Sequence, residues 1–285
     1  MWKLIVLALV LALGIGVATA LVASRNSSSE ARDAFAQLVE AAVAPEVRFD
    51  LSMLDGLPEV ARRYFIHAIA PGTPLRTTVR LRMTGEFLLG DARKFQTYAM
   101  NADQVLSPPD QFVWMPTMRS GIIDISGSDA LVADKAWTRF WMNGLVRVVD
   151  LGGTADMARS ALSRSAMEAI WVPASLLPDR GVRWEQIGPD TARLTFATEI
   201  EPVDILLGPD GAVRQVVTMR WSDVNTATRF QLQPFGGTVE GEATFGGFTI
   251  PSEVRIGNHF GTPDYLPFFQ AELVEVEFLP ADGKS

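Results

Sequence analysis

Val79-Arg80-Leu81-Arg82-Met83-Thr84 alternates apolar with charged or polar side chains, and this alternation sets the class of fold. Successive side chains of a β-strand point to opposite faces, so a period of two predicts a strand with one buried and one solvated face. From this stretch onward, short runs of the same kind recur between turn sequences such as Gly208-Pro209-Asp210-Gly211. Short spacing between such runs favours antiparallel neighbours.

The expected fold is α+β and mainly β: a large curved antiparallel sheet, as a half-barrel or open barrel, with a packed central helix. That helix is predicted over residues 155–170, with Thr154 as its N-cap and small residues that allow close approach to a sheet. The other strands are predicted at 95–105, 111–115, 121–125, 130–133, 136–141, 182–186, 192–198, 203–207, 213–221, 228–233, 238–245, 252–258 and 271–278.

The N-terminus carries twenty consecutive residues without a charge, Leu4 to Ala23. A helix of about 20 apolar residues matches the bilayer core, so residues 1–25 are predicted to be a transmembrane anchor or signal segment. Cleavage after the small-x-small sequence Ala18-Thr19-Ala20 is the alternative. The anchor is favoured because the apolar run continues past that site. We expect a single-pass, N-in membrane protein with its domain outside the cytoplasm, or a secreted or periplasmic domain after cleavage.

The rest of the chain divides into a short connection and one domain. Residues 26–56 are expected to be a helical linker, which begins at a capping box formed by Ser27 and Glu30. Residues 57–285 are expected to form a single β-rich extracytoplasmic domain, because no low-complexity linker divides them. Its first helix is predicted to begin at Leu57-Pro58-Glu59, with proline at the first helical position.

Composition limits the classes of partner. The formal net charge is −8, from 25 Lys and Arg against 33 Asp and Glu, and three basic residues never occur in a row. Nucleic acid binding is therefore not expected. The chain has no cysteine, so it has neither a disulfide nor a lipid-modified cysteine. With two histidines and no calcium-loop pattern, no metal and no cofactor are expected.

The sequence has no cysteine nucleophile, no His-Glu-x-x-His motif, no glycine-rich phosphate loop and no Gly-x-Ser-x-Gly motif, and no catalytic residue is assigned. A cell-envelope hydrolase using His259, in the glycine-flanked loop 257–261, or Glu86, beside Gly85, is an alternative. A histidine beside a turn and a solvated strand glutamate are the simpler interpretations, which favour a protein that is not an enzyme. Arg164 and Glu168 lie four residues apart on the predicted helix, a spacing typical of an ion pair.

Tryptophan is the most suggestive residue type after the N-terminal segment, because its large ring lines apolar pockets as well as cores. Trp137 and Trp141 share one strand face with Arg139 between them. Plain core packing is the alternative for each tryptophan. The candidate ligand-binding residues are Trp114, Trp137, Trp141, Trp171 and Trp184, with Arg147 as a headgroup contact.

A series of motifs resembles a bacterial family known as a domain of unknown function. The strongest is Glu168-Ala169-Ile170-Trp171-Val172-Pro173-Ala174-Ser175-Leu176-Leu177-Pro178, which is followed by Val182-Arg183-Trp184. The resemblance covers roughly residues 55–280. It implies a β-rich domain with a helix laid against it, similar to the half-barrel of LolA/LolB-type lipoprotein carriers. Earlier motifs of the series are Leu57-Pro58, Arg62-Arg63-Tyr64, Gly85-Glu86-Phe87, Phe112-Val113-Trp114 and Gly144-Leu145-Val146-Arg147-Val148.

These observations together favour a binding module. We expect a membrane-tethered extracytoplasmic domain that binds a hydrophobic or lipid-like ligand in an apolar cavity, with residues 4–23 in the membrane. The hydrolase is one alternative. A non-catalytic scaffold in an envelope complex, with a protein partner that the sequence does not identify, is the other.

Overall fold

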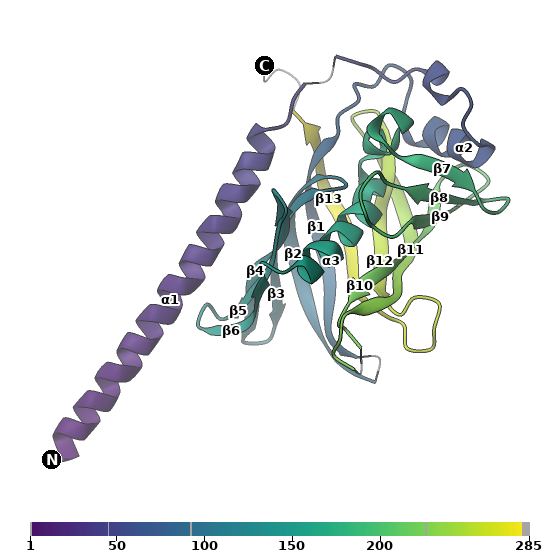
Figure 1. Ribbon diagram of the computed structural model, residues 1–285. Coiled ribbons are helices and arrows are strands. Elements are labelled where there is room, and N and C mark those ends of the chain that lie inside the picture. The colour runs from purple at the N-terminus through teal and green to yellow at the C-terminus, as the bar shows by residue number, and fades with distance from the viewer. Residues whose placement is uncertain (1, 45, 92, 226, 281–285) are drawn as a thin grey trace.

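The computed structural model describes residues 2–44, 46–91, 93–225 and 227–280, and a 13-stranded antiparallel sheet forms the body of this part (Figure 1). The strands are β1 (Thr78–Asp91), β2 (Lys94–Ser107), β3 (Gln111–Ser120), β4 (Ile123–Val132), β5 (Lys135–Met142), β6 (Val146–Gly152), β7 (Arg183–Gln186), β8 (Thr191–Thr195), β9 (Val203–Leu207), β10 (Val213–Ser222), β11 (Gln231–Phe245), β12 (Phe248–Asn258) and β13 (Leu266–Leu279). The helices are α1 (Trp2–Glu40), α2 (Glu59–Ala68) and α3 (Ala155–Glu168), with short 3₁₀ helices at Leu51–Leu54, Ala169–Trp171, Pro173–Leu176 and Pro178–Arg180.

Two meanders make up this sheet. β1 to β6 form one and β7 to β13 the other, each with sequence neighbours paired, and the two meet where β1 pairs with β13. The outer edges are therefore β6 and β7, and the chain must cross from one edge to the other between them. α3 makes this crossing along the concave face, where it contacts β3, β4 and β5 of the first meander and β10 of the second (Figure 1). The predicted curved antiparallel sheet with a packed central helix is thus confirmed.

Several strands are longer than their sequence patterns indicated. β4 joins the two short strands predicted at 121–125 and 130–133, and β11 joins those at 228–233 and 238–245. β6 was not predicted at all, because its side chains are mostly exposed on both faces. Apolar and polar side chains alternate weakly along some strands, because α3 covers their inner face and α1 covers their outer face.

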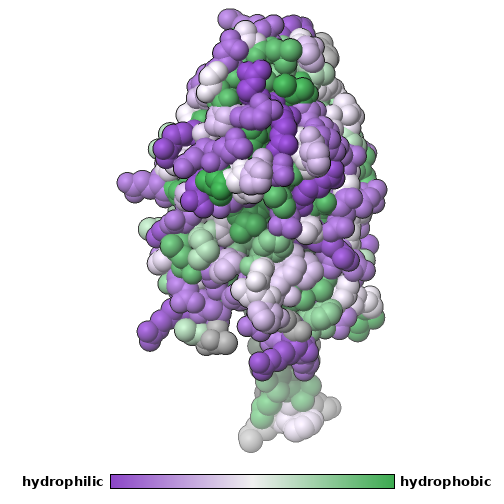
Figure 2. Space-filling model, turned by 90° about the vertical axis from the view of Figure 1, so that its right-hand side faces the viewer, coloured by the Kyte–Doolittle hydropathy of each residue, from purple (hydrophilic) through white to green (hydrophobic). Residues whose placement is uncertain are grey.

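α1 is one continuous helix from Trp2 to Glu40, so the helix expected to begin at Ser27 does not begin there. The helix already runs through the residues before Ser27, so no helix end needs a cap at that point. The C-terminal part of α1 packs on the outer face of the sheet, where Ala34 and Leu38 contact a cluster that includes Val113, Ala130 and Trp137. The N-terminal part projects from the body and carries exposed apolar residues (Figure 2).

The membrane span predicted for residues 4–23 is not confirmed. In the described part of the chain, no helix combines the length and the apolar character that crossing a membrane requires.

A tight crossing of backbones occurs at Gly127 in β4. A Cβ atom on this residue would overlap the carbonyl oxygen of Arg139 and crowd Phe140 on β5. Both obstacles include backbone atoms, which cannot move aside as the end of a flexible side chain could. The close approach of β4 and β5 near the concave face therefore requires glycine.

We expect Gly127→Ala to lower the free energy of unfolding by about 1–3 kcal/mol, because the added methyl group forces the two strands apart. Denaturant unfolding of the full chain measures this change. Ser126→Ala, one residue away and without a side-chain hydrogen bond among the described residues, is the matched control and should shift the stability by less than about 0.5 kcal/mol. Equal stabilities of the two variants would contradict the close approach.

Candidate ligand-binding site

A cavity of about 300 Å³ lies between the concave face of the sheet and α3. Most of its wall is apolar, and both meanders contribute to it. Leu89 and Val148 line the cavity and are themselves exposed, so they mark its mouth. Representative wall residues are Phe87, Met118, Phe140, Val216, Phe268 and Phe269.

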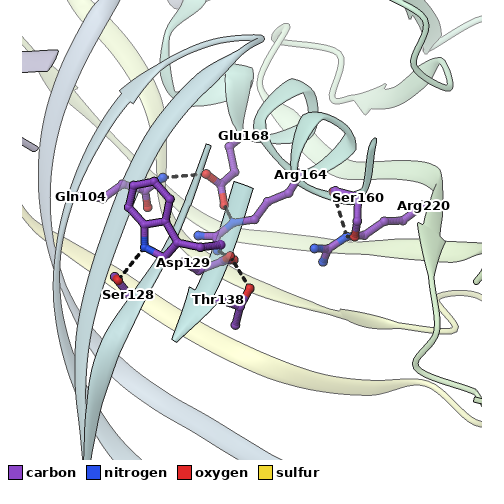
Figure 3. Close-up of polar contacts among 9 residues, drawn as sticks. Gln104, Ser128, Asp129, Thr138, Ser160, Arg164, Glu168 and Arg220 are labelled. Atoms are coloured by element: carbon purple, nitrogen blue, oxygen red, sulfur yellow. Dashed lines mark hydrogen bonds and ion pairs between the residues drawn. The ribbon is translucent and has the colours of Figure 1, made fainter. Parts of the chain in front are cut away.

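One end of the cavity is polar, and Arg164 of α3 is its central residue. Its guanidinium pairs with Glu168 one turn along the helix, at 2.7 Å from Nε to Oε1, and with Asp129 on β4. Thr138 Oγ1 donates to Asp129 at 2.8 Å, and Gln104 Nε2 donates to Glu168 at 2.6 Å. Figure 3 shows these side chains meeting between α3 and the strands. The predicted pair of Arg164 and Glu168 is therefore part of a larger buried network.

The electrostatics of Arg164 favour its charged form. Burial alone would lower the pKa of its guanidinium, but the charges of Glu168 and Asp129 outweigh burial and raise that pKa above its usual value. The same guanidinium lies over the rings of Phe112 and Trp114, with Cζ 4.7 and 5.0 Å from the two ring centroids. These cation–π contacts fix the cation at the wall of the cavity.

A second arginine, Arg220 of β10, lines the same end of the cavity. Its Nε donates to Ser160 on α3, 3.2 Å from Oγ (Figure 3). Its Cζ lies 4.8 Å from the ring centroid of Phe235. No carboxylate among the described residues lies within ion-pair distance of it. Burial lowers the pKa of Arg220 to about 10, so the side chain is still a cation at neutral pH.

Two of the five candidate tryptophans, Trp114 and Trp171, line this cavity. Trp171 Nε1 donates to the carbonyl of Pro251 at 3.1 Å, which holds the ring at the end of α3. Trp114 Nε1 is buried and has no hydrogen-bond partner among the described residues. The two rings remain candidate ligand contacts.

The other candidates lie elsewhere. Trp184 packs between Tyr64 and Phe65 of α2, with ring centroids 5.3 and 5.1 Å away, and its Nε1 donates to a backbone carbonyl. Trp137 and Trp141 do share a face, as predicted, but it is the outer face: Trp137 packs with Ala34 and Leu38 of α1, and Trp141 lines a recess beside the same helix. Phe140, between them, lines the cavity.

Arg147 is on the outside as well. Its Cζ lies 5.1 Å from the ring centroid of Trp141, and its guanidinium pairs with Asp150 at 2.8 Å. It lines a separate polar recess beside α1, not the apolar cavity. Sequence periodicity identifies residues that share a strand face, but it does not tell which face is concave.

The two hydrolase candidates are not brought together with other polar groups. Glu86 is exposed on β1, and His259 lies in the turn after β12 with φ at 61°. Neither side chain makes a hydrogen bond or ion pair within the described ranges. In the same residues, no cluster of three or more metal-ligating side chains occurs.

Sequence reasoning did not identify Gln104, Asp129, Thr138 or Arg220 as site residues. All four lie on strands of the sheet and face the concave side, where they meet α3 only through the pairing of distant segments. The sequence carries only a weak signal for these four residues. Gln104, for example, lies on a strand with several other polar residues, such as Asp103 beside it, and yet it is completely buried.

Comparison with known proteins identifies the family. The model of a family of unknown function, DUF6544, matches residues 47–271. The chain belongs to DUF6544. The predicted resemblance to an uncharacterised family is therefore confirmed over most of its expected range. A search of curated protein sequences finds no match.

Solved structures similar to this DUF6544 chain include three bacterial proteins. A LolA superfamily protein from Nitrosomonas europaea has a TM-score of 0.39 at 8% identity, over 76% of this chain and 90% of that one. A putative outer membrane lipoprotein-sorting protein domain from Vibrio parahaemolyticus has a TM-score of 0.34 at 12% identity, over 80% of this chain and 93% of that one. A DUF1329 family protein from Desulfovibrio piger has a TM-score of 0.38 at 9% identity, over 80% of this chain and 92% of that one. Scores this low carry no argument about function, which has to come from the cavity itself.

We expect Arg164→Met to lower the free energy of unfolding by about 3–5 kcal/mol, because Asp129 and Glu168 would be left buried without their cation. Urea unfolding of the full chain measures the change. Arg159→Met is the matched control on the same helix, since Arg159 pairs with Glu201 near the surface and should cost only about 1 kcal/mol. Similar losses in the two variants would show that the Arg164 network contributes no more to the free energy of unfolding than an ion pair near the surface.

Proposed function

We propose that this protein binds a hydrophobic or lipid-like ligand in the cavity between the sheet and α3. The observation that supports this function is the combination of an apolar wall with a few polar side chains at one end. Small-molecule sites have this composition, and their volumes run from about 300 to 1,000 Å³. The cavity is at the lower end of that range, which fits one extended chain better than a bulky ligand.

The physical basis of such binding is burial of apolar surface. Transfer of apolar area from water contributes roughly 25 cal/mol per Å², and the aromatic wall offers this area without rearranging the sheet. Arg164 is paired with Asp129 and Glu168, so it keeps its hydrogen-bond partners in the wall when an apolar chain displaces water from the cavity. The polar end then sets the direction in which an amphiphile enters.

The N-terminal half of α1 supports a second part of this proposal, a membrane tether for a domain outside the cytoplasm. Leu9, Leu11 and Ile15 are 65, 64 and 57% exposed, on a segment that projects from the body. Apolar side chains so arranged are stabilised by contact with lipid or another apolar surface. A tethered domain would have a source of lipid-like ligand beside its cavity.

Ligand binding predicts that an amphiphile copurifies with the full chain and that filling the cavity removes it. In Val149→Trp, the indole should occupy the cavity, because Val149 lines its wall. The amount of copurifying amphiphile should fall by tenfold or more. The affinity for dodecanol should fall by the same factor, which is about 1.4 kcal/mol of binding free energy. Solvent extraction with mass spectrometry measures the first quantity, and equilibrium dialysis with radiolabelled dodecanol the second.

The matched control is Val274→Trp, the same change at an exposed position of β13 outside the cavity wall. It should retain the wild-type ligand content and affinity. If the wild-type chain carries no amphiphile and binds no dodecanol, the proposed function is wrong.

The tether predicts that the full chain floats with phosphatidylcholine vesicles in a density gradient. Leu9→Glu with Leu11→Glu should abolish flotation, because each charge is costly to transfer into hydrocarbon. Gln37→Glu with Ala41→Glu, which places the same charges at the C-terminal end of α1, is the control and should leave flotation intact. A wild-type chain that stays at the bottom of the gradient would contradict the tether.

A further inference from the structure

Each oxygen of the two carboxylates at the polar end of the cavity already accepts a hydrogen bond. Asp129 accepts from Thr138 with Oδ1 and from Arg164 with Oδ2. Glu168 accepts from Arg164 with Oε1 and from Gln104 with Oε2. Each of the four oxygens thus has a donor, and Arg220 is not among those donors.

Arg220 has donors to spare. A guanidinium has five N–H groups, and the only one engaged by described residues is on Nε, which contacts the hydroxyl and carbonyl oxygens of Ser160. The four N–H groups on its two terminal nitrogens have no acceptor in the described part of the chain. A partly buried cation with unused, planar donors is suited to a carboxylate or phosphate, which it can bind with two parallel hydrogen bonds.

A second unused donor lies in the same wall. Trp114 is 3% exposed, and its indole N–H has no partner among the described residues. A buried donor left unpaired costs about 1–3 kcal/mol relative to a paired one. Trp114 and Arg220 come from different meanders, and both line the cavity.

The charges at this end do not oppose an anion. Arg164 and Arg220 together balance Asp129 and Glu168, so the four side chains carry no net charge. An entering anion therefore meets a neutral cluster in which the terminal nitrogens of Arg220 are unpaired donors.

We propose that the cavity binds a single-chain amphiphile with an anionic headgroup, a carboxylate or a phosphate, and that Arg220 binds this headgroup. This inference rests on the proposed function, because it specifies the class of ligand for the same cavity. The chain of the amphiphile lies along the aromatic wall, and its headgroup accepts hydrogen bonds from the terminal nitrogens of Arg220. Arg164 acts as a positioning residue, since it occupies both nearby carboxylates.

The test compares amphiphiles that differ only in their headgroups. Equilibrium dialysis of the full chain with radiolabelled dodecanoate, dodecyl phosphate and dodecanol gives three affinities. The two anions are kept below their micelle concentrations, and dodecanol is kept below its solubility limit. We expect dodecanoate or dodecyl phosphate to bind about tenfold more tightly than dodecanol, and the stronger of the two identifies the headgroup. Arg220→Met should reduce the affinity for the anion to that for dodecanol.

The control is Arg214→Met, an exposed arginine on the same strand that pairs with Asp210. It should keep the wild-type preference for the anion. Equal wild-type affinities for the three amphiphiles would overturn the anionic headgroup but leave the proposed function standing. A preference that survives in Arg220→Met would overturn the role of Arg220. Failure to bind any of the three would overturn the proposed function and this inference together.

Discussion

The buried ion pairs of Arg164 connect the two sides of the cavity. α3 is the longest helix of the segment that joins the outer edges of the two meanders, and it lies on the concave face, so its position decides whether that face is filled, covered or open. Arg164 attaches this helix to β4 through Asp129 and is itself held by Glu168. Because a buried charge without its partner is costly, the helix cannot slide along the sheet without losing these contacts. The cavity keeps its shape for the same reason.

Local sequence patterns were sufficient for the architecture. The alternation that begins at Val79 predicted the antiparallel sheet, and small residues between 155 and 170 predicted a helix laid closely against it. These features depend on neighbours in sequence. Predicted strands were broken at Gly127 and around Gly236, because glycine interrupts an apolar pattern even where the strand continues.

The site was harder to predict, because it depends on which face of each strand becomes concave. Trp137 and Trp141 were correctly placed on one face, yet that face lies under α1, and the cavity side belongs to Phe140. The Arg164–Glu168 pair was visible from its spacing of four residues. Asp129, in contrast, is 35 residues before Arg164, and Arg220 follows Arg164 at an even greater separation, so only the folded sheet brings them together.

The pairing of β1 with β13, which joins the two meanders, affects the order in which the chain can fold. Every other neighbouring pair of strands is joined by a short connection, whereas β1 meets β13 with Thr78 opposite Leu279. Contacts between residues so far apart close a long loop, and long-range strand pairing is slow compared with hairpin formation. During synthesis, β1 emerges long before β13 exists. The first meander therefore has to wait with the inner edge of β1 unpaired, and the sheet becomes continuous only when the last strand arrives.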